Sequence, residues 1–467
     1  MRKTKIICTL GPATEKTEIL RRLIAKGADV FRLNMSHASR DWVREVVPRI
    51  RRLADELGRP VGILFDTQGP AIRTGPLAAP LELSKGDILE FRVAGVPASQ
   101  PKSVEVNYRR FAADLKRGET VLVDNGLIKL TVVEKDKRRV LCKVLTPATL
   151  GSRRHINLPG VHVRLPALSK KDIADVALGA ELGVEFVALS FVREPADLAQ
   201  LRRLLTRHKS KALVLAKIED QAAVHSIEAI IARADLIMVA RGDLGIEVPM
   251  EELPIIQRRI VKSCIRLGKP VVVATHLLES MITNRVPTRA EITDIANAVF
   301  EQADAIMLSG ETTLGHYPVE CVEVLNRVAV RIERSGGADY ARNAILEDER
   351  QKTVNSAVVL ANSLPGARLI VFTRHGTMAR HVSNLRPQHA PIFAFSASEE
   401  VRRQMSILWG VCPICIDFSD EPNATIETAE KYLRQGRLTR PGDPLVIITD
   451  LQAGTERLDS VQLRRAK

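Results

Sequence analysis

Aromatic residues, cysteines and long apolar runs are all scarce in this 467-residue sequence. Phe, Trp and Tyr make up 4% of the chain, which leaves few rings on which nucleic-acid bases could stack. The 6 cysteines lack the spacing of a disulfide framework, so we expect a cytoplasmic protein in a reducing environment. No stretch approaches the ~18 consecutive apolar residues of a membrane span, and the basic N-terminus does not resemble a signal peptide. Secreted, adhesive and membrane functions are therefore not expected.

The charge of the chain is unusual, although its hydrophobic content is ordinary. The formal net charge is +14 and the isoelectric point is about 9.7, which favours anionic partners. The basic residues are scattered along segments of helical periodicity and mixed with apolar residues, so they do not predict a nucleic-acid groove. We therefore expect an enzyme that acts on small acidic substrates, with no nucleic-acid or membrane partner.

Short runs rich in valine, isoleucine and leucine alternate with longer segments of helical periodicity. Continuous apolar runs are typical of strands that are buried on both faces, as in a parallel sheet. Eight runs of this kind occur, at residues 5–9, 28–34, 61–67, 184–192, 212–218, 236–241, 270–275 and 305–310. Eight β/α units are the number that closes a TIM barrel. An open doubly wound sheet is the alternative, but no Gly-x-Gly-x-x-Gly motif follows the first run, so we predict the barrel.

Two of the intervening segments carry signals for helix ends. An apolar stripe over residues 19–24 is followed by Gly27, which predicts a helix that ends with this glycine in the C′ position. Thr288 and Glu291 have the spacing of a capping box and predict a helix start.

Two parts of the chain depart from the β/α alternation. Residues 70–167 show alternating polar and apolar residues with Lys-Gly-Asp and Asp-Asn-Gly turns, which predicts a small antiparallel β domain. Residues 343–467 contain further apolar runs separated by helical segments. We therefore predict an α/β fold: a TIM (β/α)8 barrel formed by residues 1–69 and 168–342, an inserted small β-barrel domain at 70–167, and a C-terminal α/β domain at 343–467.

Polar residues gather where the predicted strands end, and in a TIM barrel the chemistry lies at those ends. They are Arg32, Asn34, Asp66, Thr67, Lys217, Glu219, Asp243, Thr275 and Ser309. Glu219 and Asp243 could hold Mg²⁺, while Arg32, Arg73 and Lys217 could neutralise phosphate charge. A single strand end with polar residues is more often a solvated or salt-bridged terminus. Six strand ends that all carry such residues favour an active site.

The segment Arg241-Gly242-Asp243-Leu244-Gly245 follows one of these strands directly. We predict a turn before a helix, whose free backbone N–H groups could bind an anion. A plain charged turn is the alternative.

Seven stretches resemble, in this order along the chain, the successive motifs of pyruvate kinases: TKIICTLGPAT, ADVFRLNMSHAS, FDTQGPAIRTG, LAKIED, IMVARGDLGIEVP, ATHLLESMITNRVPTRAE and ADAIMLSGETTLGHYPVE. The resemblance extends over essentially the whole chain. It implies a glycolytic phosphotransferase that uses phosphoenolpyruvate and ADP to form pyruvate and ATP, requires Mg²⁺ (or Mn²⁺), has a site at which K⁺ would assist the phosphoryl charge, and assembles as a homotetramer. It also implies that the inserted domain is a mobile lid over the site.

The resemblance also implies roles for individual residues. Lys217 would stabilise the transferring phosphoryl group and the enolate oxygen, and Arg32 would bind phosphate. Thr275 would help to deliver a proton to the enolate carbon, with Ser309 in the supporting network. The remaining sets are the substrate-carboxylate cradle at Gly242 and Asp243, the Mg²⁺ ligands Glu219 and Asp243, the nucleotide contacts Asn34, His37, Arg73 and Arg154, and the K⁺ ligands Asn34, Ser36, Asp66 and Thr67.

Several residues depart from the usual pattern of the family and leave points open. Ala71 stands where K⁺-dependent members usually have glutamate and K⁺-independent members lysine, so the K⁺ requirement is open. Gln68 and His276 also replace the commonest residues. In the C-terminal domain, the loop Thr373–Met378 differs from the sugar-phosphate loop of many relatives, so an anionic effector is a hypothesis only.

Three further alternatives remain at this stage. Cys412 and Cys415 have redox spacing, but they lie in an apolar run and we expect a buried, inert pair. A barrel lyase or aldolase acting through an enolate would share the carboxylates and the arginine. A protein that only binds metabolites or nucleic acid would fit the net charge.

Overall fold

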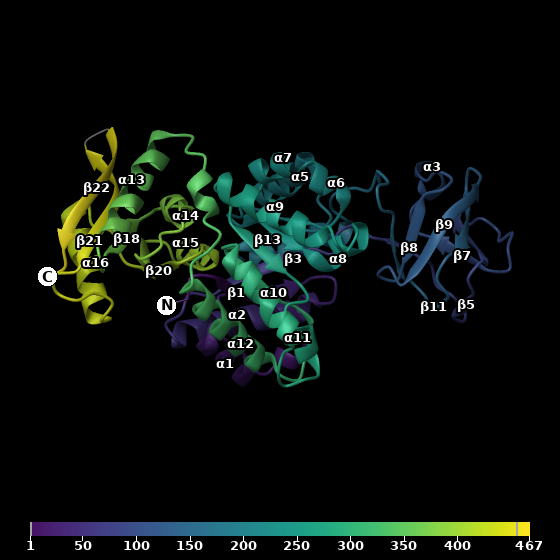
Figure 1. Cartoon of the computed structure of the whole chain (residues 1–467), viewed down its shortest axis with the longest axis horizontal. Helices are drawn as coiled ribbons and strands as arrows, with labels where there is room; N and C mark the ends of the chain where they lie inside the picture. The colour runs from purple at the N-terminus through teal and green to yellow at the C-terminus, as the bar shows by residue number, and fades with distance from the viewer. Residues whose placement is uncertain (1, 454–455) are drawn as a thin grey trace.

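The computed structural model describes residues 2–453 and 456–467. Its centre is a closed barrel of eight parallel strands in the order β1-β17-β16-β15-β14-β13-β3-β2, so each strand lies beside its successor in the β/α series (Figure 1). The strands are β1 (Lys5–Thr9), β2 (Val30–Asn34), β3 (Gly62–Asp66), β13 (Phe186–Leu189), β14 (Leu213–Ile218), β15 (Leu236–Ala240), β16 (Val271–Ala274) and β17 (Ala305–Leu308). All eight predicted runs form strands, and the predicted TIM barrel is confirmed.

Helices surround the barrel. They are α1 (Thr17–Lys26), α2 (Arg40–Glu56), α4 (Lys170–Glu181), α5 (Pro195–Arg207), α6 (Gln221–His225), α7 (Ile227–Arg233), α8 (Arg241–Glu247), α9 (Leu253–Arg266), α10 (Arg289–Phe300), α11 (Gly310–Thr313) and α12 (Pro318–Glu333), with short 3₁₀ turns η1 (Pro12–Thr14) and η2 (Glu279–Ile282). Helix α1 ends at Gly27, whose φ of 114° is left-handed, and the Thr288–Glu291 capping box begins α10, both as predicted. None of the described helices is long and apolar enough to cross a membrane.

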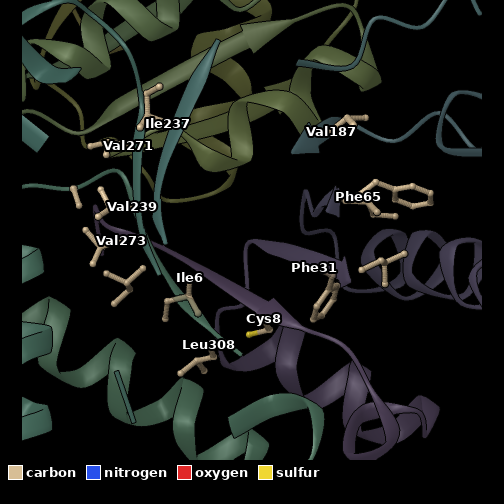
Figure 2. Packing of buried hydrophobic residues seen from close by; sticks show 14 of the residues in the cluster. Ile6, Cys8, Phe31, Phe65, Val187, Ile237, Val239, Val271, Val273 and Leu308 are labelled. Carbon is tan, nitrogen blue, oxygen red and sulfur yellow. The ribbon is translucent and has the colours of Figure 1, made fainter. Parts of the chain in front are cut away.

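Alternation along the strands separates the two faces of the barrel wall. Outward residues such as Ile6, Cys8 and Phe31 pack against the helices in one continuous core (Figure 2). Inward residues such as Val30 and Leu64 belong to a second cluster, which continues from the barrel interior into the C-terminal domain. Because side chains alternate, residues two positions further along each strand also point inward, nearer the C-terminal mouth. The strand sequences therefore place a charged layer directly above an apolar one.

The inserted domain also folds as a small barrel, and in Figure 1 it lies at the opposite end of the molecule from the C-terminal domain. Its elements are β4 (Ile72–Arg73), β5 (Leu81–Leu83), β6 (Ile88–Val93), β7 (Ser103–Val106), α3 (Phe111–Asp114), β8 (Thr120–Val123), β9 (Ile128–Lys135), β10 (Arg139–Val144), β11 (Ala148–Leu150) and β12 (His155–Asn157). Seven strands pair in the order β4-β12-β8-β9-β10-β6-β7, and a bridge between Thr74 and Val106 brings the two ends of this sheet together. The prediction of a purely antiparallel domain was wrong for β6 and β7, which pair in parallel. The long connection between them returns the chain to the end from which β6 starts.

The C-terminal domain is a five-stranded sheet in the order β20-β19-β18-β21-β22. The turn η3 (Tyr340–Asn343) precedes it and packs against the barrel core. The elements of the domain are α13 (Glu349–Ser363), β18 (Arg368–Phe372), α14 (Thr377–Asn384), β19 (Ile392–Ser396), α15 (Glu399–Gln404), η4 (Met405–Ile407), β20 (Val411–Cys415), α16 (Pro422–Gln435), β21 (Pro444–Ala453) and β22 (Glu456–Arg465). The polar strand β22 was not predicted; it pairs with β21 in antiparallel register. The strands of each sheet fall inside the predicted segments 1–69, 70–167, 168–342 and 343–467, whose boundaries remain predictions. Met1 and residues 454–455 lie outside the described part of the chain.

Buried ion pairs join the C-terminal domain to the barrel. Asp304, just before β17, accepts a hydrogen bond of 2.7 Å from Arg386, and both side chains are 2% exposed. Glu185, just before β13, is bound by Arg403 at 2.7 Å and by Arg51 at 2.8 Å. Each carboxylate stands at the N-terminal end of a barrel strand, on the side away from the barrel mouth.

The cysteine pair of the C-terminal domain lies on strand β20. Cys412 is opposite Phe393 and Cys415 opposite Ser396, three residues apart along an extended strand. Side chains at that spacing point to opposite faces of a sheet. All six cysteines are free, and burial raises the pKa of both thiols. Both residues are half-buried, so the prediction of a buried pair was wrong, while the opposed side chains and raised pKa values support the predicted inertness.

His381 on α14 gives the C-terminal domain a pH-dependent stability. Burial, reinforced by Arg380 and Arg350, lowers the pKa of His381 to about 4, against the opposing charges of Asp348 and Asp459. In the unfolded chain this histidine has a pKa near 6.5, so as the pH falls it binds a proton there before it does in the folded protein. The contribution of His381 to the free energy of unfolding is therefore intact above pH 6.5 and is lost as the pH falls towards 4. Between pH 7 and pH 5 we expect the free energy of unfolding of His381→Gln to fall by about 1–2 kcal/mol less than that of the wild type.

Urea unfolding at the two pH values measures this effect. The exposed His389, changed to glutamine, is the matched control and should follow the wild type. An unchanged pH dependence in His381→Gln would rule out this origin of the acid sensitivity.

Candidate active site

Four charged side chains form a nearly dry cluster at the barrel mouth. Arg32, Asp66, Lys217 and Glu219 are each at most 9% exposed. Asp66 is central: Arg32 Nε lies 2.6 Å from its Oδ2, and Lys217 Nζ lies 3.3 Å from its Oδ1. Lys217 Nζ also lies 2.7 Å from Glu219 Oε1. The predicted convergence of these side chains, which come from the ends of the three strands β2, β3 and β14, is therefore present in the structure.

Neutral hydroxyls complete the cluster. Lys217 Nζ donates to Ser190 Oγ at 2.8 Å, and Arg32 donates to Thr9 Oγ1 at 3.0 Å. Ser190 Oγ in turn donates to the carbonyl oxygen of Thr67 at 2.7 Å. Sequence reasoning missed Ser190 and Thr9. The available signal was position: Thr9 ends the predicted run 5–9, and Ser190 stands two residues before the end of the predicted run 184–192, although the observed strand β13 already ends at Leu189.

The cluster keeps the ammonium group charged. Burial opposes the charge of Lys217, but the carboxylates of Asp66 and Glu219 outweigh it and raise the pKa of the amine. Burial would also raise the pKa of Asp66, yet Lys217 and Arg32 hold it below its usual range. Burial raises the pKa of Glu219, and the attraction of Lys217 only partly offsets this. Lys217 therefore presents a permanent positive charge in a site where water screens it little.

The segment Arg241–Glu247 is a short helix, α8, so the predicted turn before a helix was wrong. The Arg241 side chain donates to Asp294 of α10 at 2.7 Å and to the carbonyl oxygens of Ala274 and Thr275. These bonds hold the start of α8 against the end of β16, so the chain passes from strand to helix without a turn. Tertiary contacts here override the turn tendency of Gly and Asp.

Thr275 lies beside the start of α8 in a strained turn. The backbone N–H of Gly242 donates to Thr275 Oγ1 at 2.8 Å, and that hydroxyl donates to the Ala274 carbonyl at 2.6 Å. Thr275 and His276 have φ values of 71° and 56°, a left-handed conformation that is costly for residues with a Cβ. Strain of this kind clusters at functional sites.

Ser309 is not joined to Thr275. Its Oγ is buried and has no hydrogen-bond partner among the described residues, while its backbone N–H donates to Glu311 Oε2 at 2.7 Å. The structure thus leaves the predicted supporting network without a direct link between these two hydroxyls.

Of the four residues predicted to contact the nucleotide, His37, Arg73 and Arg154 lie at the edge of the site, whereas Asn34 stands opposite Asp66 of the charged cluster in the register of β2 and β3. Arg73 is exposed on β4 and donates to the carbonyl of Arg153 at 3.1 Å. Arg154 is 3.4 Å from Asp124 within the inserted domain, and His37 and Ser36 are exposed after β2. The structure therefore does not bring Arg73 into contact with the phosphate-binding candidates Arg32 and Lys217.

The underside of the inserted domain approaches the cluster through His155. Its ring lies 5.9 Å from that of Phe191, whose backbone N–H donates to Glu219 Oε2 at 2.5 Å. Burial lowers the pKa of this histidine, and the nearby charges of Asp243 and Arg73 act on it in opposite directions. Neither His155 nor Phe191 was predicted from its sequence context.

The carboxylates at the mouth suit a magnesium ion. Glu219 and Asp243 follow β14 and β15, which are neighbours in the barrel. No group of three or more His, Cys, Asp or Glu side chains that could hold a metal occurs among residues 2–453 and 456–467. A pair of carboxylates is sufficient for Mg²⁺, which takes its other ligands from water and substrate oxygens.

Comparison with known proteins gives the family. A family model described as "Pyruvate kinase, barrel domain" matches residues 1–322, and one described as "Pyruvate kinase, alpha/beta domain" matches residues 351–462. The chain belongs to the pyruvate kinase family. A pyruvate kinase from Bacillus licheniformis is 39% identical over 99% of this chain and 80% of its own length. One from Mycobacterium tuberculosis is 38% identical over 97% of this chain and 96% of its own length.

Solved structures agree with this assignment. A crystal structure of a pyruvate kinase from Cryptosporidium parvum superimposes with a TM-score of 0.95 at 33% identity, covering 100% of this chain and 96% of that one. This member of the pyruvate kinase family is thus a phosphotransferase that converts phosphoenolpyruvate and ADP into pyruvate and ATP. The assignment confirms the predicted activity over the lyase and the non-catalytic alternatives.

Proposed function

We propose that Lys217 is the residue that carries phosphoryl transfer in this enzyme. The supporting observation is its ammonium group, 8% exposed and held by Asp66, Glu219 and Ser190 at the barrel mouth. In the reaction the enol P–O bond breaks while a bond forms to the terminal phosphate oxygen of ADP. Lys217 stabilises the charge on the moving phosphoryl group and on the enolate oxygen left behind, and Arg32 binds phosphate beside it.

The residues around α8 are proposed to handle the carbon end of the substrate. Backbone N–H groups at Gly242 and Asp243 bind the substrate carboxylate at the start of this short helix, with Gly242 exchanging its bond to Thr275 Oγ1 for one to the carboxylate. The Thr275 hydroxyl, fixed by Gly242 and Ala274, lies where it can help to protonate the enolate carbon. Ser309 is proposed to assist Thr275, with its unpartnered Oγ as the supporting observation.

Glu219 and Asp243 are proposed to hold Mg²⁺ (or Mn²⁺), which when bound neutralises phosphate charge as a Lewis acid. Asn34, His37, Arg73 and Arg154 are proposed to bind the nucleotide. The inserted domain then acts as a lid that excludes water from the transferred group.

We expect turnover to require K⁺. Ala71 and Gln68 carry no charge, so the chain supplies no fixed cation at the position where K⁺-independent relatives have lysine. Asn34 lies opposite Asp66 in the register of β2 and β3, and Thr67 follows directly, so with Ser36 these residues can offer oxygens to one ion. A positive charge there assists the phosphoryl charge, and its loss should lower turnover at least about tenfold.

Pyruvate formation from phosphoenolpyruvate, ADP and Mg²⁺ tests both the proposed reaction and the K⁺ requirement. The assay compares K⁺ with an equal concentration of tetramethylammonium, which controls for ionic strength. Equal rates in the two salts would refute the K⁺ site, and no turnover in either salt would refute the reaction itself.

We also propose a small-anion effector pocket in the C-terminal domain. A cavity of about 210 Å³ is lined by Thr373 and Arg374 of the predicted loop, together with Ser419, Thr425 and others. Asp420 also lines it, so the charge of Arg374 is partly opposed. This chemistry fits a ligand with few negative charges better than a bisphosphate.

A homotetramer in the cytoplasm is our proposal for the working state. Large apolar side chains stand exposed on α9 and α13, where Ile255 and Val359 are each 61% exposed, and Met250 before α9 is 73% exposed. Such side chains suit contacts between subunits. The free cysteines fit a reducing compartment.

A further inference from the structure

The lid and the barrel are joined by one buried polar contact. Asn157, the last residue of β12, donates from Nδ2 to Oε1 of Glu247, the last residue of α8, at 2.9 Å. The two residues are 5% and 8% exposed. Among the residues that the structure describes, this is the one side-chain to side-chain hydrogen bond between the lid sheet and the barrel.

Both elements joined by this bond carry proposed ligand-binding residues at their other ends. Helix α8 begins beside Gly242 and Asp243, which are proposed to bind substrate and Mg²⁺. Strand β12 begins at His155, directly after Arg154, which is proposed to bind the nucleotide. The bond therefore fixes the distance between the nucleotide side and the substrate side of the site.

Barrel residues also anchor the two connections to the lid. The backbone N–H of Gln68 donates to Asp172 at 2.9 Å where the chain enters the lid. Arg193 donates to the carbonyls of Val163 and Leu165, at 2.5 and 2.6 Å, where it returns. With these two connections fixed, the lid can change its angle mainly by moving β12 relative to α8.

The surroundings of the bond make its breakage costly but sterically possible. Among the described residues Asn157 Oδ1 is buried without a partner, and its surroundings include the apolar Ile156 and Phe191 as well as the polar Asp220 and Gln221. A cavity of about 240 Å³ lies beside Asn157 and Glu247, which leaves room for β12 to shift. A buried polar pair favours the arrangement that keeps its hydrogen bond, because separating the partners loses that bond in a site that screens it little.

We propose that Asn157 and Glu247 are positioning residues whose hydrogen bond sets the lid angle and thereby couples nucleotide binding to substrate binding. This inference rests on the proposed function of the site. Neither residue touches the reacting groups; the pair acts through α8 on Asp243 and through β12 on Arg154. A purely structural pair would contribute to folding stability and leave the coupling between the two ligands unchanged.

The coupling is measurable with the full-length enzyme and Mg²⁺ through a pair of ligands that cannot react. Pyruvate and ADP together lack a phosphoryl group to transfer, so ADP affinity can be measured by calorimetry with and without saturating pyruvate. In the wild type we expect pyruvate to tighten ADP binding at least about fivefold. Glu247→Met should abolish this factor, whereas Glu247→Gln, which keeps an acceptor for Asn157, should retain it.

A reversed pair separates coupling from stability. Asn157→Asp places two carboxylates together and should lose the coupling. The double variant Asn157→Asp with Glu247→Gln moves the amide to α8 and the carboxylate to the lid, and it should regain the coupling. This comparison tests the role of the hydrogen bond in the coupling even if Glu247→Met fails to fold. Wild-type coupling in Asn157→Asp, no recovery in the double variant, or no coupling in the wild type would each overturn the inference.

The proposed function fails in a different way. Absence of pyruvate formation by the wild type would refute the reaction, whereas the coupling factor is measured without turnover. Lys217→Met is the control that separates the two proposals, since it should lose turnover while pyruvate still tightens ADP binding.

Discussion

Replacing Lys217 with methionine should lower the turnover number by at least about three orders of magnitude. The ammonium group is buried with Asp66 and Glu219, so its charge acts through a medium that screens it little. The negative charge beside this ammonium group is greatest while the phosphoryl group is being transferred. Its loss should therefore affect the transition state far more than the bound ground state.

Binding and turnover must be measured together to test this role. We expect Mg²⁺ and phosphoenolpyruvate affinities in Lys217→Met to stay within a few-fold of the wild type, since Arg32, Glu219 and Asp243 remain. The matched control is Lys211→Met, because Lys211 precedes the same strand and its side chain is 79% exposed. That control should keep normal turnover. Near-normal turnover in Lys217→Met would refute the proposed role of Lys217 in phosphoryl transfer.

Replacing Arg386 with methionine should destabilise the protein by about 3–5 kcal/mol. The guanidinium group and Asp304 are both almost fully buried between the C-terminal domain and the barrel. Removing the cation leaves the Asp304 carboxylate, within the part of the chain that the structure describes, with the backbone N–H groups of Val271 and Trp409 at 3.0 and 3.3 Å. An uncompensated carboxylate in that position costs far more than the lost bond alone.

Urea denaturation measures this loss, and an exposed ion pair provides the comparison. Arg21 and Glu56 lie on α1 and α2 with side chains 39% and 42% exposed. Arg21→Met should therefore change stability by less than about 1 kcal/mol. A similar small change in Arg386→Met would mean that the pair does not hold the two domains together.

The sequence by itself determined most of the barrel and much of its mouth. Valine- and isoleucine-rich runs predict strands buried on both faces, because only a covered parallel sheet accommodates them. Two-residue alternation then places Lys217 and Glu219 on the same inner face, where the structure also finds Asp66. Local signals such as Gly27 and Thr288 were equally reliable, since a helix end depends on a few adjacent residues.

Only the tertiary structure decided features that depend on partners distant in the sequence. Arg241 begins a helix because Asp294 and the end of β16 hold it, although Gly-Asp-Leu-Gly locally favours a turn. Ser190 joins the lysine cluster through Lys217, which comes from another strand.

The contacts between domains follow the same rule. Asn157 meets Glu247, and Arg386 meets Asp304, across interfaces that no local pattern encodes. Short-range periodicity fixes which face of an element is buried, but the partner of a buried polar group is set by how separate elements pack.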